Sequence, residues 1–247
     1  MSAAALVGTY LFLPESRPAG LRRKRPKRQR AAPLTISRVL TARPVITILA
    51  LVTFLSFVTS SVRESILALW IASQLDFGPQ AIGLIFSWNG IVVTSTQGFL
   101  IGPLAERFGE RVVLRLGLSA YLIGLVGLMT SPDLPVFLIS TTLNAFGTGA
   151  FASALPTMFS GHAAEGERGQ IIAVYQSTGS LSRFIGPTFS GALYQIVGIS
   201  APFAFGVCAL AVGLALTFLL PGATSGATKQ SSGGRSGTQN PPPPPKP

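Results

Sequence analysis

Six long apolar runs occupy most of this 247-residue chain, and they constrain its fold more than any other feature. They lie at about residues 44–72, 81–102, 112–130, 136–159, 171–198 and 202–220, with short polar segments between them. Each is close to the roughly 20 residues that a helix needs to cross a bilayer. The backbone finds no water in the hydrocarbon core, so each run is expected to be helical. The sequence therefore predicts an all-α, polytopic membrane protein with a six-helix bundle at residues 44–221.

The composition agrees with a membrane protein and excludes most soluble classes. Apolar residues make up 48% of the chain and charged residues 11%, whereas soluble domains are roughly 25% charged. The net charge of +11 comes from cations beside the apolar runs, which argues against a nucleic-acid-binding protein. The single cysteine, Cys208, cannot form a disulfide within the chain. No nucleophile motif, phosphate-binding loop or metal-ligand cluster is present, so we expect no enzyme, metal or cofactor.

The distribution of positive charge predicts how the chain crosses the membrane. Residues 1–13 are apolar but too short to span, and we interpret them as the remnant of a preceding transmembrane helix. Residues 14–43 are rich in Lys and Arg, which gather in cytoplasmic loops. Placing this basic linker inside puts Asp76 and Asp133 outside. It also puts the tail, residues 222–247, inside, and its Gly, Ser and Pro content predicts disorder. Both termini are therefore expected to be cytoplasmic.

A charged segment at 102–111 separates the second run from the third. Its Gly and Pro residues predict a tight turn. The segment resembles the loop signature of the major facilitator superfamily, Gly-x-Leu-x-Asp-Arg-x-Gly-Arg, with Glu in place of Asp and the last Arg one position later. The matching residues are Gly102, Leu104, Glu106, Arg107, Gly109 and Arg111. The resemblance implies that this loop controls the conformational switch of a transporter.

The order of features resembles the second half of that family, helices 7–12 with a remnant of helix 6. A basic loop precedes the six runs, and the signature follows the second of them. The glycine-rich segment that begins at Asn144 resembles part of the fourth helix of a half. The residues that resemble the glycine-proline pattern of helix 11, and imply close helix packing, are Gly179, Gly186, Pro187 and Gly191. The resemblance is greatest to the tetracycline-efflux-like or drug:proton antiporter branch, which implies efflux of small organic molecules by alternating access, with possible coupling to protons.

Polar side chains follow one stripe of the fifth run. At 100° per residue, the stripe contains Gln176, Ser180, Arg183, Pro187, Ser190 and Tyr194. A guanidinium near the middle of a span costs about 2.5–3.5 kcal/mol, so Arg183 is expected to face a cavity or a protein partner. Two interpretations stay open. Arg183 and Gln176 line a substrate cavity, or Arg183 tethers helices without touching substrate.

Arg63 and Glu64 interrupt the first run about 29 Å along an ideal helix from Pro44. Because the sequence continues apolar beyond them, we expect a broken helix at this point. Glu64 is the one acid within a run, so it can exchange protons; the alternative is an interfacial pair that extends to water. The remaining cavity candidates are Asn144 and, in the second run, Asn89, Thr96, Gln97 and Trp88; for polar side chains in spans, interhelical hydrogen bonding is the alternative.

Six helices cannot enclose a central cavity by themselves. The expected partners are the lipid bilayer, a small-molecule substrate, and either a missing N-terminal half or a second six-helix bundle. The rival hypothesis is a non-transporting scaffold or regulatory partner that binds a full-length transporter.

Overall fold

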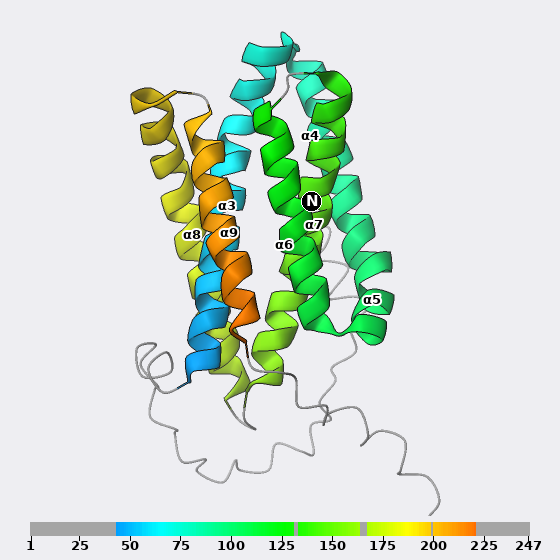
Figure 1. Ribbon diagram of the computed structural model, residues 1–247, viewed down its shortest axis with the longest axis vertical. Coiled ribbons are helices and arrows are strands. Elements are labelled where there is room, and N and C mark those ends of the chain that lie inside the picture. Colours follow the sequence, from blue (N-terminus) through cyan, green and yellow to red (C-terminus); the bar gives the residue numbers. More distant parts are fainter. Residues whose placement is uncertain (1–42, 131–132, 164–166, 199, 221–247) are drawn as a thin grey trace, which may run out of the picture. The chain divides into compact units, whose positions relative to one another are not determined.

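The computed structural model describes residues 43–130, 133–163, 167–198 and 200–220, and the regular structure of these residues is helical (Figure 1). The elements are α3 (Pro44–Leu75), α4 (Pro79–Ser95), the π-helix η2 (Thr96–Leu100), α5 (Ile101–Phe108), α6 (Glu110–Thr130), α7 (Leu134–Gly161), α8 (Arg168–Ile196) and α9 (Ala201–Phe218). The all-α prediction is confirmed. The predicted helix remnant at 1–13, the linker 14–43 except its last residue, and the tail 222–247 lie outside the described residues.

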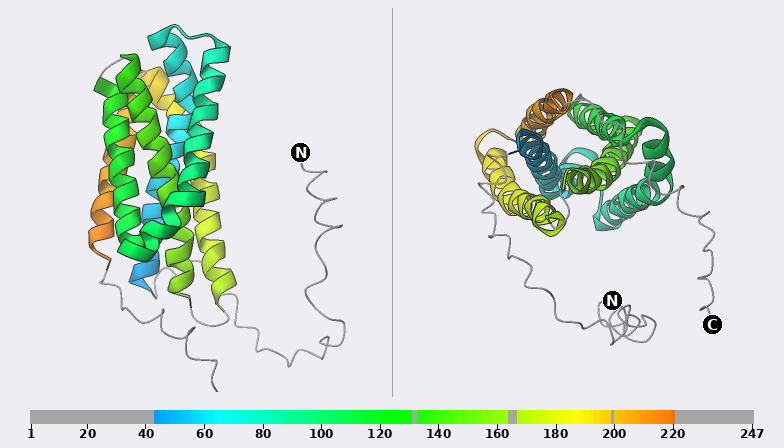
Figure 2. Two further views of the ribbon diagram at one scale, coloured as in Figure 1. Left: turned by 90° about the vertical axis from the view of Figure 1, so that its right-hand side faces the viewer. Right: turned by 90° about the horizontal axis from the view of Figure 1, so that it is seen from below.

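The helices pack as two groups that share a boundary. α3 packs against α8 and α9, whereas α7 packs against α6 and α4. Contacts of α6 with α9, and of α7 with α8 and α3, join the two groups. Figure 2 shows the arrangement from below, with α3 in blue beside α8 in yellow and α9 in orange. α3 therefore contacts helices of both groups, so a functional site between the groups can include its side chains.

Residues without a side chain let α6 and α7 approach closely. A Cβ added at Gly147 would lie 2.6 Å from the carbonyl oxygen of Gly117 and 2.6 Å from the Cβ of Tyr121. A Cβ added at Gly117 would lie 2.5 Å from the Cβ of Ala150. In a bilayer, helices associate through such close packing because lipid removes the hydrophobic driving force between them. The α6–α7 interface therefore depends on small residues.

In the described part of the chain, five helices are long and apolar enough to cross a membrane: α3, the continuous helix Pro79–Phe108, α6, α7 and α9. α8 occupies the predicted fifth span and has 29 residues, more than a span needs. Its sequence is less apolar than those of the five helices, because it contains Arg183, Gln176 and several Ser and Thr residues. A helix of this kind needs protein or water, rather than lipid, along its polar side.

α3 is one unbroken helix of 32 residues. The expected break near Arg63 and Glu64 is wrong, because the helix continues for three more turns to Leu75 and is capped by Asp76, whose φ is 51°. At 1.5 Å per residue it is about 48 Å long, longer than the roughly 30 Å hydrocarbon core. The backbone has no reason to break, since both charged side chains find polar partners while the helix stays intact.

The second predicted span continues as a helix through most of the charged segment. α4 passes into η2 and then into α5, which ends at Phe108. The predicted turn over 102–111 is therefore too long, because most of these residues are helical. The chain reverses at Gly109, whose φ of 82° favours glycine, and α6 begins at the next residue. The π-helix lies just before Pro103, which lacks an N–H and would crowd the carbonyl of Phe99 in a regular helix.

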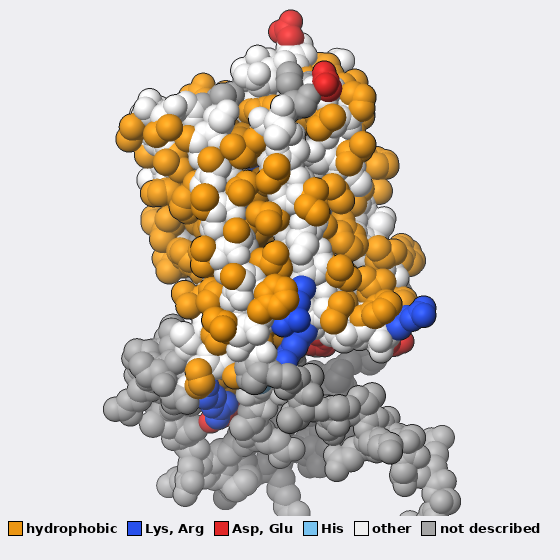
Figure 3. Space-filling model, in the orientation of Figure 1, with side chains coloured by type: hydrophobic (Ala, Val, Ile, Leu, Met, Phe, Trp, Pro, Cys, Tyr) orange, Lys and Arg blue, Asp and Glu red, His pale blue; other side chains and the backbone are white. Residues whose placement is uncertain are grey.

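Charged side chains mark the two ends of the helices. Figure 3 shows apolar side chains over the middle of the visible face, basic side chains together with some acidic ones at the lower end, and acidic side chains alone at the upper end. The helix ends at the lower end of the bundle carry basic residues, namely Arg43, Arg107 and Arg168. The turns at the upper end carry Asp76 and Asp133. This is the asymmetry on which the prediction of a cytoplasmic lower end depends.

Candidate functional site

Phe57, Ser60 and Glu64 share one face of α3, because residues three and seven positions apart lie on the same side of a helix. The Phe57 ring packs against Phe151 of α7 and Tyr175 of α8, with centroids 5.4 and 6.1 Å away. This face of α3 is therefore the one between α7 and α8. The Glu64 side chain on it is 56% exposed.

Arg183 of α8 lies against the same face of α3. Its guanidinium carbon is 4.9 Å from the centroid of the Phe57 ring, a cation–π contact. Ser61 donates a hydrogen bond to the Arg183 carbonyl oxygen at 3.5 Å, which sets the register of α8 on α3. Within the described residues, the exposed guanidinium makes no ion pair or hydrogen bond. The ring orients the guanidinium and leaves its N–H groups available.

The rest of the polar stripe of α8 divides into exposed and buried positions. Gln176 and Ser180 are exposed like Arg183. Ser190 is buried instead, and its hydroxyl donates to the Val62 carbonyl oxygen at 3.4 Å. We define the charged face as Phe57, Ser60 and Glu64 of α3 together with Gln176, Ser180 and Arg183 of α8.

Arg63 is adjacent to Glu64 but faces α6. It is 6% exposed, and its Nε donates to the hydroxyl of Tyr121 at 3.2 Å. Its Nη2 lies 3.9 Å from Glu64 Oε1, which accepts a hydrogen bond from Ser60 at 3.1 Å. Its buried Nη1 has no hydrogen-bond partner among the described residues. Arg63 thus joins α3 to α6 and influences the carboxylate of the charged face electrostatically.

The three predicted amide residues lie on other surfaces. Asn144 is fully buried where α7 meets α6, and its Nδ2 donates to the Ser140 carbonyl oxygen at 2.7 Å. Asn89 lies on the buried side of α4, and its Nδ2 donates to the Ile85 carbonyl oxygen at 2.9 Å. Gln97 is exposed on η2. The structure therefore groups Arg183, Gln176 and Glu64 and leaves the three amide residues elsewhere.

The glycines and proline of α8 occupy both sides of the helix. A Cβ added at Gly186 would lie 2.6 Å from Cβ of Ser61, so the two helices touch at this position. One added at Gly179 would lie 3.7 Å from the Phe57 ring. Gly191 has open space around its Cβ direction, and Pro187 is exposed.

The signature residues form a separate region at the end of the bundle. Glu106 and Arg107 are exposed on α5, and the Arg107 guanidinium carbon lies 5.5 Å from the centroid of the Phe108 ring. Gly102 is exposed, and Leu104 and Arg111 are half-buried. The charged face lies within α3 and α8, away from their ends, so any influence of the signature on it has to pass through the helices.

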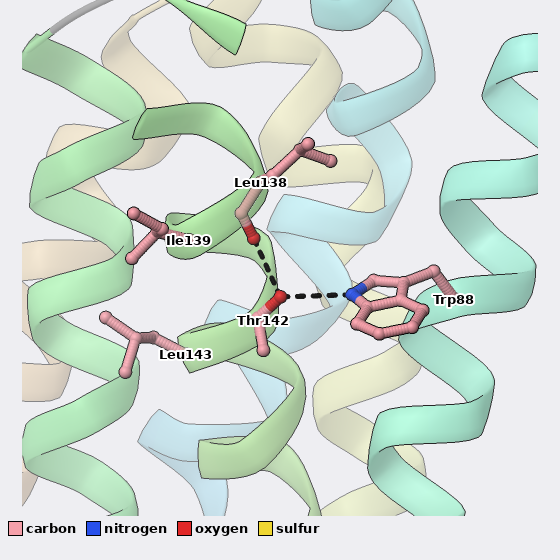
Figure 4. A pocket seen from close by; sticks show the side chains of 5 residues that line it. All are labelled: Trp88, Leu138, Ile139, Thr142 and Leu143. Atoms are coloured by element: carbon pink, nitrogen blue, oxygen red, sulfur yellow. Dashed lines mark hydrogen bonds between the residues drawn. The ribbon is translucent and has the colours of Figure 1, made fainter. Parts of the chain in front are cut away.

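Sequence reasoning missed Tyr121. It named Trp88 as a cavity candidate but did not foresee the hollow between α4 and α7 that Trp88 lines. Tyr121 stands in an apolar run that gives no sign of a partner for Arg63. The hollow has a volume of about 480 Å³. Trp88 projects across it, and its Nε1 donates to Thr142 Oγ1 at 3.0 Å (Figure 4). Its other lining residues are Leu138, Ile139 and Leu143. An indole and a hydroxyl 54 positions apart leave no signal in the sequence.

Comparison with known proteins finds relatives among membrane transport proteins. The tetracycline resistance protein, class C, of Escherichia coli is 30% identical over 202 residues, which cover 78% of this chain and 50% of that protein. The major facilitator superfamily domain-containing protein 10 of Mus musculus is 28% identical over 176 residues, covering 70% and 36%. This chain thus spans half or less of the length of these relatives.

A solved structure shows the same fold. The human organic anion transporter MFSD10 (TETRAN) superposes with a TM-score of 0.65 at 21% identity, over 75% of this chain and 45% of that chain. Residues 49–245 also match the family model of the Major Facilitator Superfamily, which is most of the chain. The apolar helices and this match together make the chain a multi-pass membrane protein that belongs to the Major Facilitator Superfamily.

Proposed function

We propose that the chain forms one six-helix half of a secondary transporter for small organic molecules. The charged face carries this proposal, because Arg183 is exposed near the middle of α8 and Glu64 is exposed about two-thirds of the way along α3, and both helices are of spanning length. An arginine at the centre of a bilayer costs about 2.5–3.5 kcal/mol on insertion scales. Charges at this depth are expected to face a water-filled cavity or another protein surface.

A second six-helix bundle completes the cavity in this proposal, either an N-terminal half or another chain. Two such bundles then rock around a central site, so that the site opens to each side of the membrane in turn. The low apolarity of α8 supports a protein neighbour along its exposed stripe. The signature segment guides the rocking, because Gly109 is a one-residue hinge between two rigid helices.

Protons are the proposed coupling ion, and Glu64 is their proposed carrier. Among the described residues, the other carboxylates lie at helix ends, whereas Glu64 lies within α3. Its carboxylate is exposed and has a single hydrogen-bond donor, Ser60. The similarity to a tetracycline resistance protein supports efflux of drugs or similar molecules. The exchange for protons rests on Glu64 alone, and both termini are proposed to be cytoplasmic from the distribution of Lys and Arg.

The test compares Glu64→Gln with Asp76→Asn, which removes the same charge at the end of α3. Asn is well tolerated at the left-handed backbone of that position. The protein, as its native gene encodes it, is placed in sealed vesicles with a pH gradient, and flux of tetracycline, an organic cation and an organic anion is measured. Glu64→Gln is expected to abolish the effect of the pH gradient on substrate flux, while the amount of protein in the vesicles stays the same. Asp76→Asn is expected to keep the effect of the gradient. A full response of Glu64→Gln removes Glu64 as the carrier.

The rival function is a non-transporting scaffold or regulator that binds a full-length transporter. The exposed polar stripe of α8 favours a protein partner under this hypothesis too. Flux by the purified wild-type protein counts against the rival. Absence of flux, together with capture of a longer transporter that binds through α8, supports it.

A further inference from the structure

The charged face presents two opposite charges with an aromatic ring beside one of them. The Arg183 guanidinium lies over Phe57, and Glu64 is seven residues further along α3. Seven residues of helix rise roughly 10 Å, so the two charges are separated by about this distance along the helix axis. Both side chains are exposed on the same side of the bundle.

Arg183 is arranged to bind an anionic group. The Phe57 ring contacts the guanidinium, which leaves the N–H donors at the edge free of described partners. Those donors form a planar fork that matches the two oxygens of a carboxylate. An acidic group of a bound molecule can therefore pair with Arg183 while its apolar part lies against the adjacent ring.

Glu64 is arranged to bind a cationic nitrogen. Its nearest cation, Arg63 Nη2, lies at 3.9 Å, too far for a direct hydrogen bond. The other charged or titratable groups that face this region are Tyr121 of α6 and Arg183 and Tyr175 of α8. α4, α7 and α9 contribute no charged side chain within their described spans. Arg63 and Ser60 both contact Oε1, so among the described residues Oε2 has no partner, and this exposed oxygen is the one that a basic nitrogen from outside the chain can reach.

We infer that the charged face recognises an amphoteric organic molecule, whose acidic group binds Arg183 and whose basic nitrogen binds Glu64. This inference rests on the proposed transport function, which brings such a molecule to the face. A molecule with one charge leaves either the guanidinium or the carboxylate desolvated without a partner, which is unfavourable. A proton on Glu64 removes the partner of the nitrogen, so proton and substrate compete for one carboxylate. Such competition is what exchange of substrate for protons requires.

The experiment uses three probes with one scaffold: 4-(2-aminoethyl)benzoic acid, its methyl ester and its N-acetyl derivative. The first has both charges, the ester has only the cation and the N-acetyl derivative only the anion. Equilibrium binding of the radiolabelled probes to the native protein is measured without a pH gradient. The amphoteric probe is expected to bind at least about tenfold more tightly than either derivative, because each derivative lacks one of the two charge-assisted contacts.

Variants separate the two ends of the site. Arg183→Gln is expected to reduce binding of the amphoteric probe to that of the ester and to leave the ester unchanged. Glu64→Gln is expected to reduce it to that of the N-acetyl derivative. Arg168→Gln, which removes an exposed cation at the start of α8, is the matched control and keeps the preference.

The outcomes distinguish this inference from the proposed function. Equal affinities for the three probes overturn the inference, and so does an equal loss for all three in Arg183→Gln. If the three probes bind with equal affinity but a pH gradient drives flux of any one of them, the proposed transport function stands. Selective binding without flux of any probe overturns the transport function and keeps the recognition.

Discussion

The α6–α7 interface and the charged face both place polar side chains inside spanning helices, but the chain pairs them differently. At the interface, Asn144 is fully buried and its amide donates to a carbonyl of its own helix. At the charged face, the Arg183 guanidinium is exposed, and among the described residues its one partner is an aromatic ring. In the first region Asn144 is closed off from other molecules, even though its buried Oδ1 has no hydrogen-bond partner among the described residues. The second region leaves exposed hydrogen-bonding groups available to another molecule.

The comparison teaches how to separate structural from functional polar residues in a span. Polar residues of both kinds break an apolar run in the same way, and both are accepted only away from lipid. Burial distinguishes them, because Asn144 is fully buried and Arg183 is exposed. The predictions below test whether the interface responds through stability and the charged face through recognition.

The largest effect is expected from Gly147→Val at the interface. The new side chain begins 2.6 Å from both the Gly117 carbonyl oxygen and the Tyr121 Cβ, so α6 and α7 must separate. Overpacking of this kind costs about 3 kcal/mol or more where backbone has to move. Thermal unfolding of the detergent-solubilised protein measures the loss.

Gly90→Val is the matched control for this substitution. Gly90 is exposed on α4 and has no atom within 4 Å of its Cβ direction. The control is expected to unfold at the temperature of the wild type. If both variants lose stability equally, the loss comes from replacing glycine in a helix, and the close approach of α6 and α7 is not its cause.

A smaller loss of stability is expected from Tyr121→Phe, which acts between the two regions. The phenol accepts the hydrogen bond from Arg63 Nε, and Arg63 Nη1 is already buried without a described partner. Removing the acceptor leaves a second buried donor of a charged group unpaired, at a cost of about 1–3 kcal/mol. Unfolding measurements on Tyr121→Phe, with Cys208→Ser as an unrelated control, check the value.

The double variant Arg63→Met with Tyr121→Phe sharpens this prediction. Once the charge is absent, the missing hydroxyl no longer matters, so the double variant should be more stable than the sum of the single effects predicts. Strictly additive effects would show that the hydrogen bond between the two helices contributes little.

Hydrophobic length predicted the helices, but pairing between helices was beyond the sequence. Long apolar runs specify spans because a bilayer leaves the backbone no alternative to helix. The same runs do not show which face of α3 meets α6, so the Arg63 contact with Tyr121 was unforeseen and a helix break was expected instead. The stripe of α8 was predictable from its 100° periodicity, because its polar residues contrast with apolar neighbours.

The smallest change in stability is expected from Arg183→Gln, although its effect on recognition is the largest. An exposed cation–π contact contributes about 0.5–1 kcal/mol, and the guanidinium has no other described partner to lose. Unfolding of this variant should therefore lie within about 1 kcal/mol of the wild type, while the preference for the acidic group disappears. A loss of stability as large as that of Tyr121→Phe would mean that Arg183 tethers α8 to α3. Arg183 would then be a structural residue, like Asn144 between α7 and α6. In that case the charged face is a structural interface, and the two regions differ only in the depth at which they bury their polar groups.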